Sequence, residues 1–255
     1  NFGTWNGSVA GAVFGVFGGA GDEGAAAMSA RVDLQLQDDP GPGWMRADPV
    51  HLRADPASIS LTYGQPLGLN QADATALVDE LRATQPFDLI QFSDPNRWYL
   101  PVTADISTCA PSGVAGAGME ATLPRGNDGR AWRTRLTEAQ MVLHASVVNE
   151  RREARGLAPV NSLWLWGGGV PPNLELDRFT VIHSDDPVAR GIAATHSTRC
   201  SDVLQNFGRL ALADAPTREL VTLETVHGLA AAGNVEAWRA GIEQIEELWL
   251  KPALK

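Results

Sequence analysis

Lysine is nearly missing from this chain, which holds it only at Lys251 and Lys255. Acidic residues outnumber basic ones, 30 Asp and Glu against 20 Lys and Arg, so the formal net charge is −10. No run rich in Lys and Arg occurs. Because nucleic acids and anionic lipid surfaces attract clustered positive charge, we expect neither a nucleic acid nor a membrane as a partner.

Long apolar runs and cysteines are scarce too. The most apolar stretch, SVAGAVFGVFGGAG at residues 8–21, is too short and too rich in glycine to span a membrane. It also lacks the basic start of a signal peptide. The two cysteines, Cys109 and Cys200, lie far apart without the spacing of a metal site. The sequence leaves a disulfide between them as an alternative, but two reduced thiols in a cytoplasmic protein are the simpler interpretation.

Several catalytic and nucleotide-binding signatures are absent. Gly167–Gly169 is not followed by the Gly-Lys-Ser/Thr of a P-loop, and no dinucleotide fingerprint occurs. Neither Ser162 nor Ser184 lies in a Gly-x-Ser-x-Gly motif, and no Ser-His-Asp arrangement can be assembled from spacing. The length of 255 residues and the apolar fraction of 44% suit one large globular domain or two small ones.

The most informative segment that is present runs from Val147 to Gly169. A charged, helix-like stretch is followed by a loop closed by Pro159, a short apolar run with two tryptophans, and three glycines. This order predicts a buried strand, Leu163–Trp166, whose carboxyl end opens into a loop. In open α/β sheets ligands bind beyond that end, and glycines let a backbone approach closely. A tight turn with nothing bound is an equally weighted alternative.

Strands and helices alternate after Thr137. We expect a helix from Thr137 to about Arg155, strands at Leu163–Trp166, Phe179–His183 and Leu220–Leu223, and helices from about Val188 and over Val235–Leu248. Such alternation predicts an α/β fold with a mostly parallel sheet flanked by helices.

Residues 44–123 show a different pattern, which predicts a small α+β lobe. The expected elements are two strands around a turn at Ala54–Ala57, a helix from Asn70 to about Thr84, and strands at Phe87–Phe92 and Arg97–Val102. Upstream, Gly11–Ala30 predicts a helix broken by loops, because glycine is costly inside helices.

Several motifs carry a resemblance to known families. Asn161, Trp164, Trp166, Gly167 and Gly169 form an Asn-x-x-Trp-x-Trp-Gly-x-Gly stretch that resembles one in the archaeal-type, cofactor-independent phosphoglycerate mutases. Together with WMRADPVHL, RWYL, HSDDPVARGIA and the Trp238…Trp249-x-x-Pro252 pattern, it looks closer still to bacterial RpfE-type regulatory proteins. The resemblance covers most of the chain from about Trp44.

This resemblance implies an alkaline-phosphatase-like α/β fold. Residues 1–43 and 124–255 would form the α/β domain, and residues 44–123 would be an inserted lobe. In the mutases a strand and a metal-bound nucleophile come first. No equivalent strand is visible here, so we expect the N-terminal part of the domain to be incomplete in this sequence.

The resemblance also implies two divalent metals, but a motif for their ligands is altered. The family's Asp-x-x-Gly-His stretch corresponds here to Thr225-Val226-His227 through Gly233-Asn234, so its aspartate is missing and its Gly-His reads Gly233-Asn234. His227 is more simply a hydrogen-bonded loop residue than a ligand. We therefore expect no dinuclear metal site and no cofactor, and a vestigial, regulatory or ligand-sensing protein. The alternative is an active enzyme that binds Mg²⁺ or Mn²⁺ with relocated ligands.

Asp185 and Asp186 are the best remaining acidic pair. They follow an expected strand and precede an expected helix, so carboxylates there could bind a hard cation. Capping is the favoured interpretation, with Ser184 or Asp185 at the helix start and Asp186 at its positive end. Arg190 could pair with Asp186 at i, i+4.

A second polar cluster lies in WMRADPVHLRAD. Arg46 and Asp48 share one face of an expected strand, and His51 and Arg53 follow. Two arginines could hold a phosphate or carboxylate, while a surface Arg46–Asp48 pair with Arg53 in solvent is the simpler alternative. Arg97 is expected to stack at a sheet edge.

These expectations combine into a cleft between the two lobes. Arg46, His51 and Arg53 would face Asn161, Gly167, Gly168 and Gly169 and the loop of Ser184, Asp185 and Asp186. The partner would be a small anionic metabolite, bound weakly because of the acidic pair, or else another protein.

Overall fold

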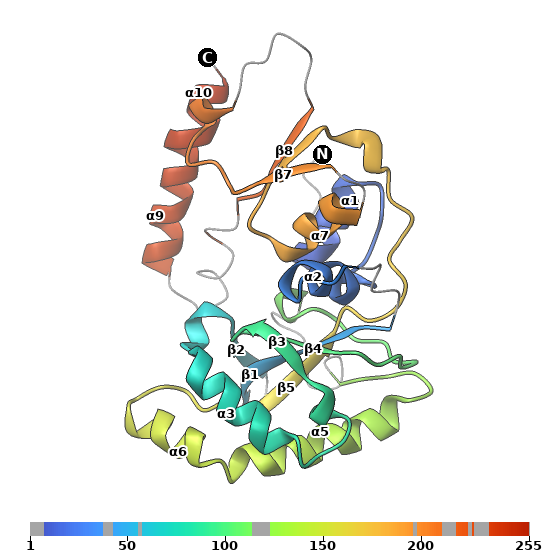
Figure 1. Cartoon of the computed structure of the whole chain (residues 1–255). Helices are drawn as coiled ribbons and strands as arrows, with labels where there is room; N and C mark the ends of the chain where they lie inside the picture. Colours follow the sequence, from blue (N-terminus) through green and yellow to red (C-terminus); the bar gives the residue numbers. More distant parts are fainter. Residues whose placement is uncertain are drawn as a thin grey trace.

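The computed structural model describes residues 8–37, 43–55, 58–113, 123–195, 198–210, 218–223, 226 and 235–254 of the chain. These residues form a mixed α/β structure with two separate sheets (Figure 1). One sheet is antiparallel and has five strands, and the other is parallel and has three.

The antiparallel sheet is organised around β1 (Met45–Asp55). This strand pairs with β2 (Ser58–Tyr63), β4 (Arg97–Leu100) and β5 (Ser162–Trp166), and β3 (Gln91–Asp94) continues the sheet beyond β4. The expected hairpin after Trp44 is confirmed by the β1–β2 pairing, although residues 56 and 57 of its turn lie outside the described part of the chain. Phe87–Leu89 forms a 3₁₀ turn instead of the start of a strand.

Three helices cover one face of this sheet: α3 (Gln71–Leu81), α5 (Gly129–His144) and α6 (Val147–Ala154), below it in Figure 1. The expected cap of α3 is confirmed, because the Asn70 side-chain oxygen accepts a 2.8 Å hydrogen bond from the Asp73 amide. The expected single helix from Thr137 to Arg155 is wrong. The Ser146 hydroxyl accepts from the amides of Val148 and Asn149, so it caps a new helix.

The location of β5 corrects the predicted sheet. Leu163–Trp166 is a buried strand as expected, but it runs antiparallel to β1 and does not join the parallel strands. Leu163 and Leu165 face the α3, α5 and α6 helices, while Trp164 and Trp166 face the opposite side. Because both faces are covered, the run is apolar throughout, and such a run does not distinguish a parallel strand from an antiparallel one.

The parallel sheet has the order β7-β6-β8. Its strands are β6 (Val181–His183), β7 (Arg199–Ser201) and β8 (Glu219–Val221), so the strands expected near His183 and Leu220 are confirmed. The helix α7 (Pro187–Thr195) follows β6 and packs on this sheet through a cluster that includes Ile182 and Ile192. His183 bonds to Ser201 at 2.7 Å and to Glu219 at 2.9 Å, so one imidazole links all three strands.

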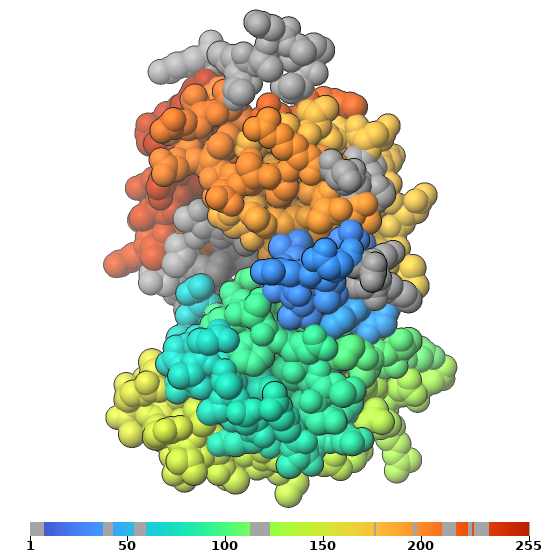
Figure 2. Space-filling view, viewed as in Figure 1, coloured from blue at the N-terminus to red at the C-terminus, as the bar shows by residue number. Residues whose placement is uncertain are grey.

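Short N-terminal helices lie where the two sheets meet. The expected broken helix is confirmed as α1 (Val9–Val16) and α2 (Ala25–Asp33). Figure 2 shows the blue N-terminal segment at the surface between the upper orange part and the lower green and cyan part. Because α2 packs against both α7 and β1, it joins the two sheets.

The C-terminal helix stands along one side of the molecule (Figure 1). It consists of α9 (Val235–Ile245), a π-helical segment (Glu246–Leu250) and α10 (Lys251–Ala253). No helix in the described part of the chain is long and apolar enough to cross a membrane.

Candidate functional site

The candidate site is a cavity of ≈ 240 Å³ where the two sheets meet. It is bounded by β1, β2, β4, β5 and the start of α7. The polar side chains in its lining include Arg46, Asp48, Tyr63, Gln65, Asp94, Asn96, Arg97, Ser112 and Asp186. Two groups from the predicted cleft, Arg46 and Asp186, are therefore brought together although 140 positions separate them.

Arg46 forms a buried ion pair with Asp48. Its Nε and Nη2 atoms each donate to a carboxylate oxygen at 2.8 Å, and the two side chains are 6% and 7% exposed. The sequence pairing is confirmed because residues two apart in a strand share a face. The expected surface location is wrong, since Arg46 and Asp48 are each only 5% exposed.

Aromatic groups complete the surroundings of this ion pair. The Arg46 guanidinium carbon lies 5.1 Å from the Tyr99 ring centroid and 5.0 Å from that of Trp166. Asp48 also accepts a 2.7 Å hydrogen bond from the Trp166 indole nitrogen. Charge-assisted bonds and cation–π contacts hold the pair as one neutral unit, so Arg46 has little net charge to offer an anion.

Asp186 both caps α7 and lines the cavity. Its Oδ1 accepts from the Ala189 amide at 2.7 Å, so Asp186 itself caps the helix, and the expected cap at Ser184 or Asp185 is wrong. The Asp186 amide donates to the Ser184 hydroxyl. Burial raises the pKa of the Asp186 carboxyl, although the amides of Ala189 and Val188 and the charge of Arg46 act in the opposite direction. The expected Arg190–Asp186 side-chain pair is wrong, because Arg190 bonds to Asp202 and to the Ser184 carbonyl.

Two polar atoms in the cavity lining are buried without a hydrogen-bond partner. They are the Tyr63 hydroxyl and the Asn96 Oδ1. Burial also raises the pKa of Tyr63, with a further contribution from the charge of Asp48. Buried polar atoms are normally bonded, so each of these two lining residues keeps an unused polar atom. No motif in the sequence marks either residue, because each lies next to the cavity only through long-range strand pairing.

Several predicted site residues serve other roles. His51 Nδ1 bonds to the Pro159 carbonyl at 2.9 Å, and the Asn161 side chain bonds to both the amide and the carbonyl of Leu52. These contacts tie β1 to the segment before β5. Arg53 is exposed and lies seven residues along β1 from Arg46. None of the three lines this cavity.

The glycine turn docks α2. The carbonyl of Gly167 accepts from the Ala26 amide at 2.9 Å, and that of Gly168 accepts from the Gly24 amide at 3.0 Å. Gly167 and Gly169 have φ values of 70° and 94°, which favour glycine. The turn thus positions a helix, and its residues do not line the cavity.

Within the described ranges, no group of three or more His, Cys, Asp or Glu side chains is arranged to hold a metal ion. Thr225 and His227–Asn234, the altered motif, lie outside those ranges.

Comparison with known proteins places these observations in a family context. No protein-family model matches the chain. The chain is 29% identical over 174 residues to the 2,3-bisphosphoglycerate-independent phosphoglycerate mutase of Methanothrix thermoacetophila, a match that covers 61% of this chain and 44% of the mutase. The corresponding enzyme of Methanosarcina mazei is 33% identical over 69 residues, which cover 27% of this chain and 17% of that one.

These matches support homology with the cofactor-independent phosphoglycerate mutases. The match spans less than half of the Methanothrix mutase.

Two solved structures show a looser likeness. The cofactor-independent phosphoglycerate mutase of Thermoplasma acidophilum has a TM-score of 0.39 at 17% identity, covering 96% of this chain and 70% of that one. A Pyrococcus horikoshii protein has a TM-score of 0.45 at 13% identity, covering 95% and 65%.

Proposed function

We propose that this chain is a mutase-related, ligand-sensing protein of the RpfE regulatory type that does not catalyse phosphoryl transfer. The main support for the proposal is that Asp48 neutralises the charge of Arg46, while the rings of Tyr99 and Trp166 lie against its guanidinium group. An arginine used to bind a phosphorylated substrate keeps its fork of donors for the phosphate. We also propose the alkaline-phosphatase-like domain of residues 1–43 and 124–255 with its inserted lobe, and a cytoplasmic location.

The lining of the cavity suggests the class of ligand. Two arginines, Arg46 and Arg97, face three aspartates, Asp48, Asp94 and Asp186, which leaves one carboxylate in excess. Arg97 is bonded further to Asp33 at 2.6 Å. A doubly charged phosphate group is therefore disfavoured. A small hydroxylated compound with at most one charge, such as glycerate, would supply hydroxyl groups to Tyr63 and Asn96.

Binding can be tested by titrating the purified protein with glycerate, glycerol and inorganic phosphate while the melting temperature is recorded. We expect glycerate or glycerol to raise the melting temperature at millimolar concentration and phosphate to have less effect. Asn96→Leu should weaken the response, whereas Asn173→Leu at an exposed position should leave it unchanged. A larger response to phosphate would contradict the proposed ligand class.

An active metal-dependent mutase is the second candidate, and the sequence similarity favours it. Such an enzyme would need Mg²⁺ or Mn²⁺ to neutralise the phosphoryl oxygens. The test is interconversion of 2- and 3-phosphoglycerate with either metal added, using heat-denatured protein as the control. We expect no turnover above the control, and metal-dependent turnover would replace the sensing proposal with the enzyme.

The proposed partners follow from the same reasoning. A small metabolite in the cavity would act through a protein partner, and the net charge of −10 argues against nucleic acid and membrane surfaces.

A further inference from the structure

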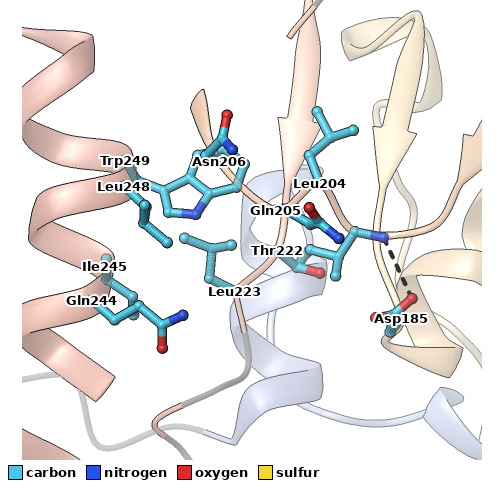
Figure 3. Close-up of a pocket in the computed structure, with 11 residues that line it drawn as sticks. Asp185, Leu204, Gln205, Asn206, Thr222, Leu223, Gln244, Ile245, Leu248 and Trp249 are labelled. Carbon is cyan, nitrogen blue, oxygen red and sulfur yellow. Dashed lines mark hydrogen bonds between the residues drawn. The ribbon is translucent and has the colours of Figure 1, made fainter. Parts of the chain in front are cut away.

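A second and larger cavity lies at the carboxyl end of the parallel sheet. Its volume is ≈ 660 Å³, and it separates the ends of β6, β7 and β8 from the C-terminal helix (Figure 3). Volumes of this order suit small-molecule sites, and the carboxyl ends of parallel strands are where α/β proteins bind ligands. This cavity shares no lining residue with the first one.

One side of the lining is apolar and includes an aromatic ring. Leu223 comes from the end of β8, while Ile245, Leu248 and Trp249 come from the C-terminal helix. Trp249 is only 9% exposed, so its indole is held by its neighbours. The accessible part of this fixed indole borders the cavity, so it can pack against a planar ring.

Carboxamide groups supply most of the polar lining. Gln205 and Asn206 follow β7, and Gln244 reaches from α9 toward the sheet (Figure 3). Each carboxamide presents an acceptor and a donor side by side, which matches the paired donor and acceptor on the edge of a nucleobase.

The charged lining is a single carboxylate. Asp185 lies at the end of β6, where one of its oxygens accepts from the Val203 amide at 3.4 Å. A carboxylate in this location can accept hydrogen bonds from sugar hydroxyls. Among the described residues that line the cavity there is no Lys, Arg or His, so none of these residues would balance a phosphate.

We propose that this cavity binds a nucleoside and discriminates against the corresponding nucleotide. The base would pack against the accessible part of Trp249, the carboxamides of Gln244 and Gln205 would bond to its edge, and the sugar hydroxyls would face Asp185. The proposal does not depend on the function of the first cavity.

The test is equilibrium binding of the four common ribonucleosides and their 5′-monophosphates to the full chain, followed by tryptophan fluorescence and by dialysis. We expect saturable binding of at least one nucleoside at submillimolar concentration. Its monophosphate should bind at least about tenfold more weakly, because the phosphate would be repelled by the Asp185 carboxylate.

Two variants test whether the nucleoside binds in this cavity. Gln244→Leu should weaken nucleoside binding about tenfold, since one base-edge contact is lost. Gln71→Leu, the same change at an exposed position on α3, should leave it unaltered. Circular dichroism and melting of both variants check that they fold.

Three results would overturn the proposal. The first is the absence of binding by every nucleoside at 5 mM, roughly the weakest affinity worth assigning to a built site. The second is binding of a nucleotide as tight as that of its nucleoside. The third is nucleoside binding that Gln244→Leu leaves unchanged. A response to glycerate that persists in any of these cases would keep the first cavity's proposal intact.

Discussion

Asp186 shows how a single carboxylate can serve a helix and a cavity at once. Its oxygen caps α7, and burial raises its pKa above the ordinary value of 3.8. The folded protein therefore binds this proton more tightly than the unfolded chain does. Protonation favours folding here, so this contribution to stability is full at low pH and is lost as the pH rises from about 4 through the raised pKa.

Asp186→Asn should remove this loss of stability with rising pH. The amide oxygen of asparagine can still accept from the Ala189 amide, so the cap is retained while the titration disappears. The free energy of unfolding, measured in urea between pH 4 and 7, should fall less with pH in the variant than in the parent protein. Asp185→Asn, at the exposed neighbouring position, is the control. Equal pH slopes for Asp186→Asn and the parent would show that the buried carboxyl does not titrate in this range.

The tryptophans of β5 form the second prediction at this scale. Trp164 and Trp166 are 6% and 8% exposed, which confirms their expected burial. Replacing either with alanine should cost about 3 kcal/mol or more in denaturant unfolding, because a large cavity is left behind. Trp166→Phe should recover part of that cost but still lose the 2.7 Å hydrogen bond to Asp48. A loss under about 1 kcal/mol for the alanine variants would contradict the packing described.

Among the elements, those with local start signals were predictable from sequence. Asn70 before α3 and Pro187 after two aspartates mark helix starts through capping chemistry that neighbouring residues supply. The break between α5 and α6 also has such a signal in Ser146, but the apolar pattern continues across it and favours one longer helix. Strand partners carry no local signal. The pairing of β5 with β1 joins residues more than 110 positions apart, and only the complete fold determines it.

Arg152 connects α6 to neighbouring loops of the antiparallel sheet region through hydrogen bonds. Its side chain is fully buried and donates to the carbonyls of Leu67, Gly68 and Ala158. Arg152→Met should destabilise the protein by about 3 kcal/mol or more, because several buried carbonyls lose their donor. Arg151→Met, at the exposed adjacent position, should change stability by less than about 0.5 kcal/mol. Similar losses for both variants would mean that helix propensity, and not the buried bonds, is responsible.

The whole molecule depends on the close approach of α2 and α7. A Cβ added to Gly191 would lie 2.0 Å from the Met28 carbonyl oxygen, whereas one added to Gly15 in α1 would meet nothing within 4 Å. Gly191→Ala should therefore force the helices apart and lower stability by about 1–3 kcal/mol or more. Gly15→Ala should be neutral or stabilising, because alanine favours helices. Equal melting temperatures for the two variants would contradict this interface.

Only part of the candidate site was predictable from the sequence, because the rest depends on strand pairing between residues that lie far apart in the chain. The sequence pointed to Arg46 and Asp186, whose motifs are local, and it indicated the Arg46–Asp48 pair from strand spacing. It gave no sign of Tyr63 or Asn96, since β2 and the β3–β4 turn reach the cavity only after the sheet forms. It also predicted that the glycine turn, Gly167–Gly169, lies beside the ligand, whereas this turn is hydrogen-bonded to the start of α2. The boundaries of the two proposed domains remain predictions.

Asp185 and Asp186 are consecutive, yet each lines a different cavity. A ligand that bonds to the Asp185 carboxylate would shift the backbone that also positions Asp186. Such a connection implies a coupling free energy between the two sites, and thermodynamics requires the coupling to be reciprocal. The factor by which a saturating nucleoside changes the affinity for glycerate should therefore equal the factor by which glycerate changes the affinity for the nucleoside. Titrations in both orders would measure it, and factors of one would mean that the two carboxylates respond independently.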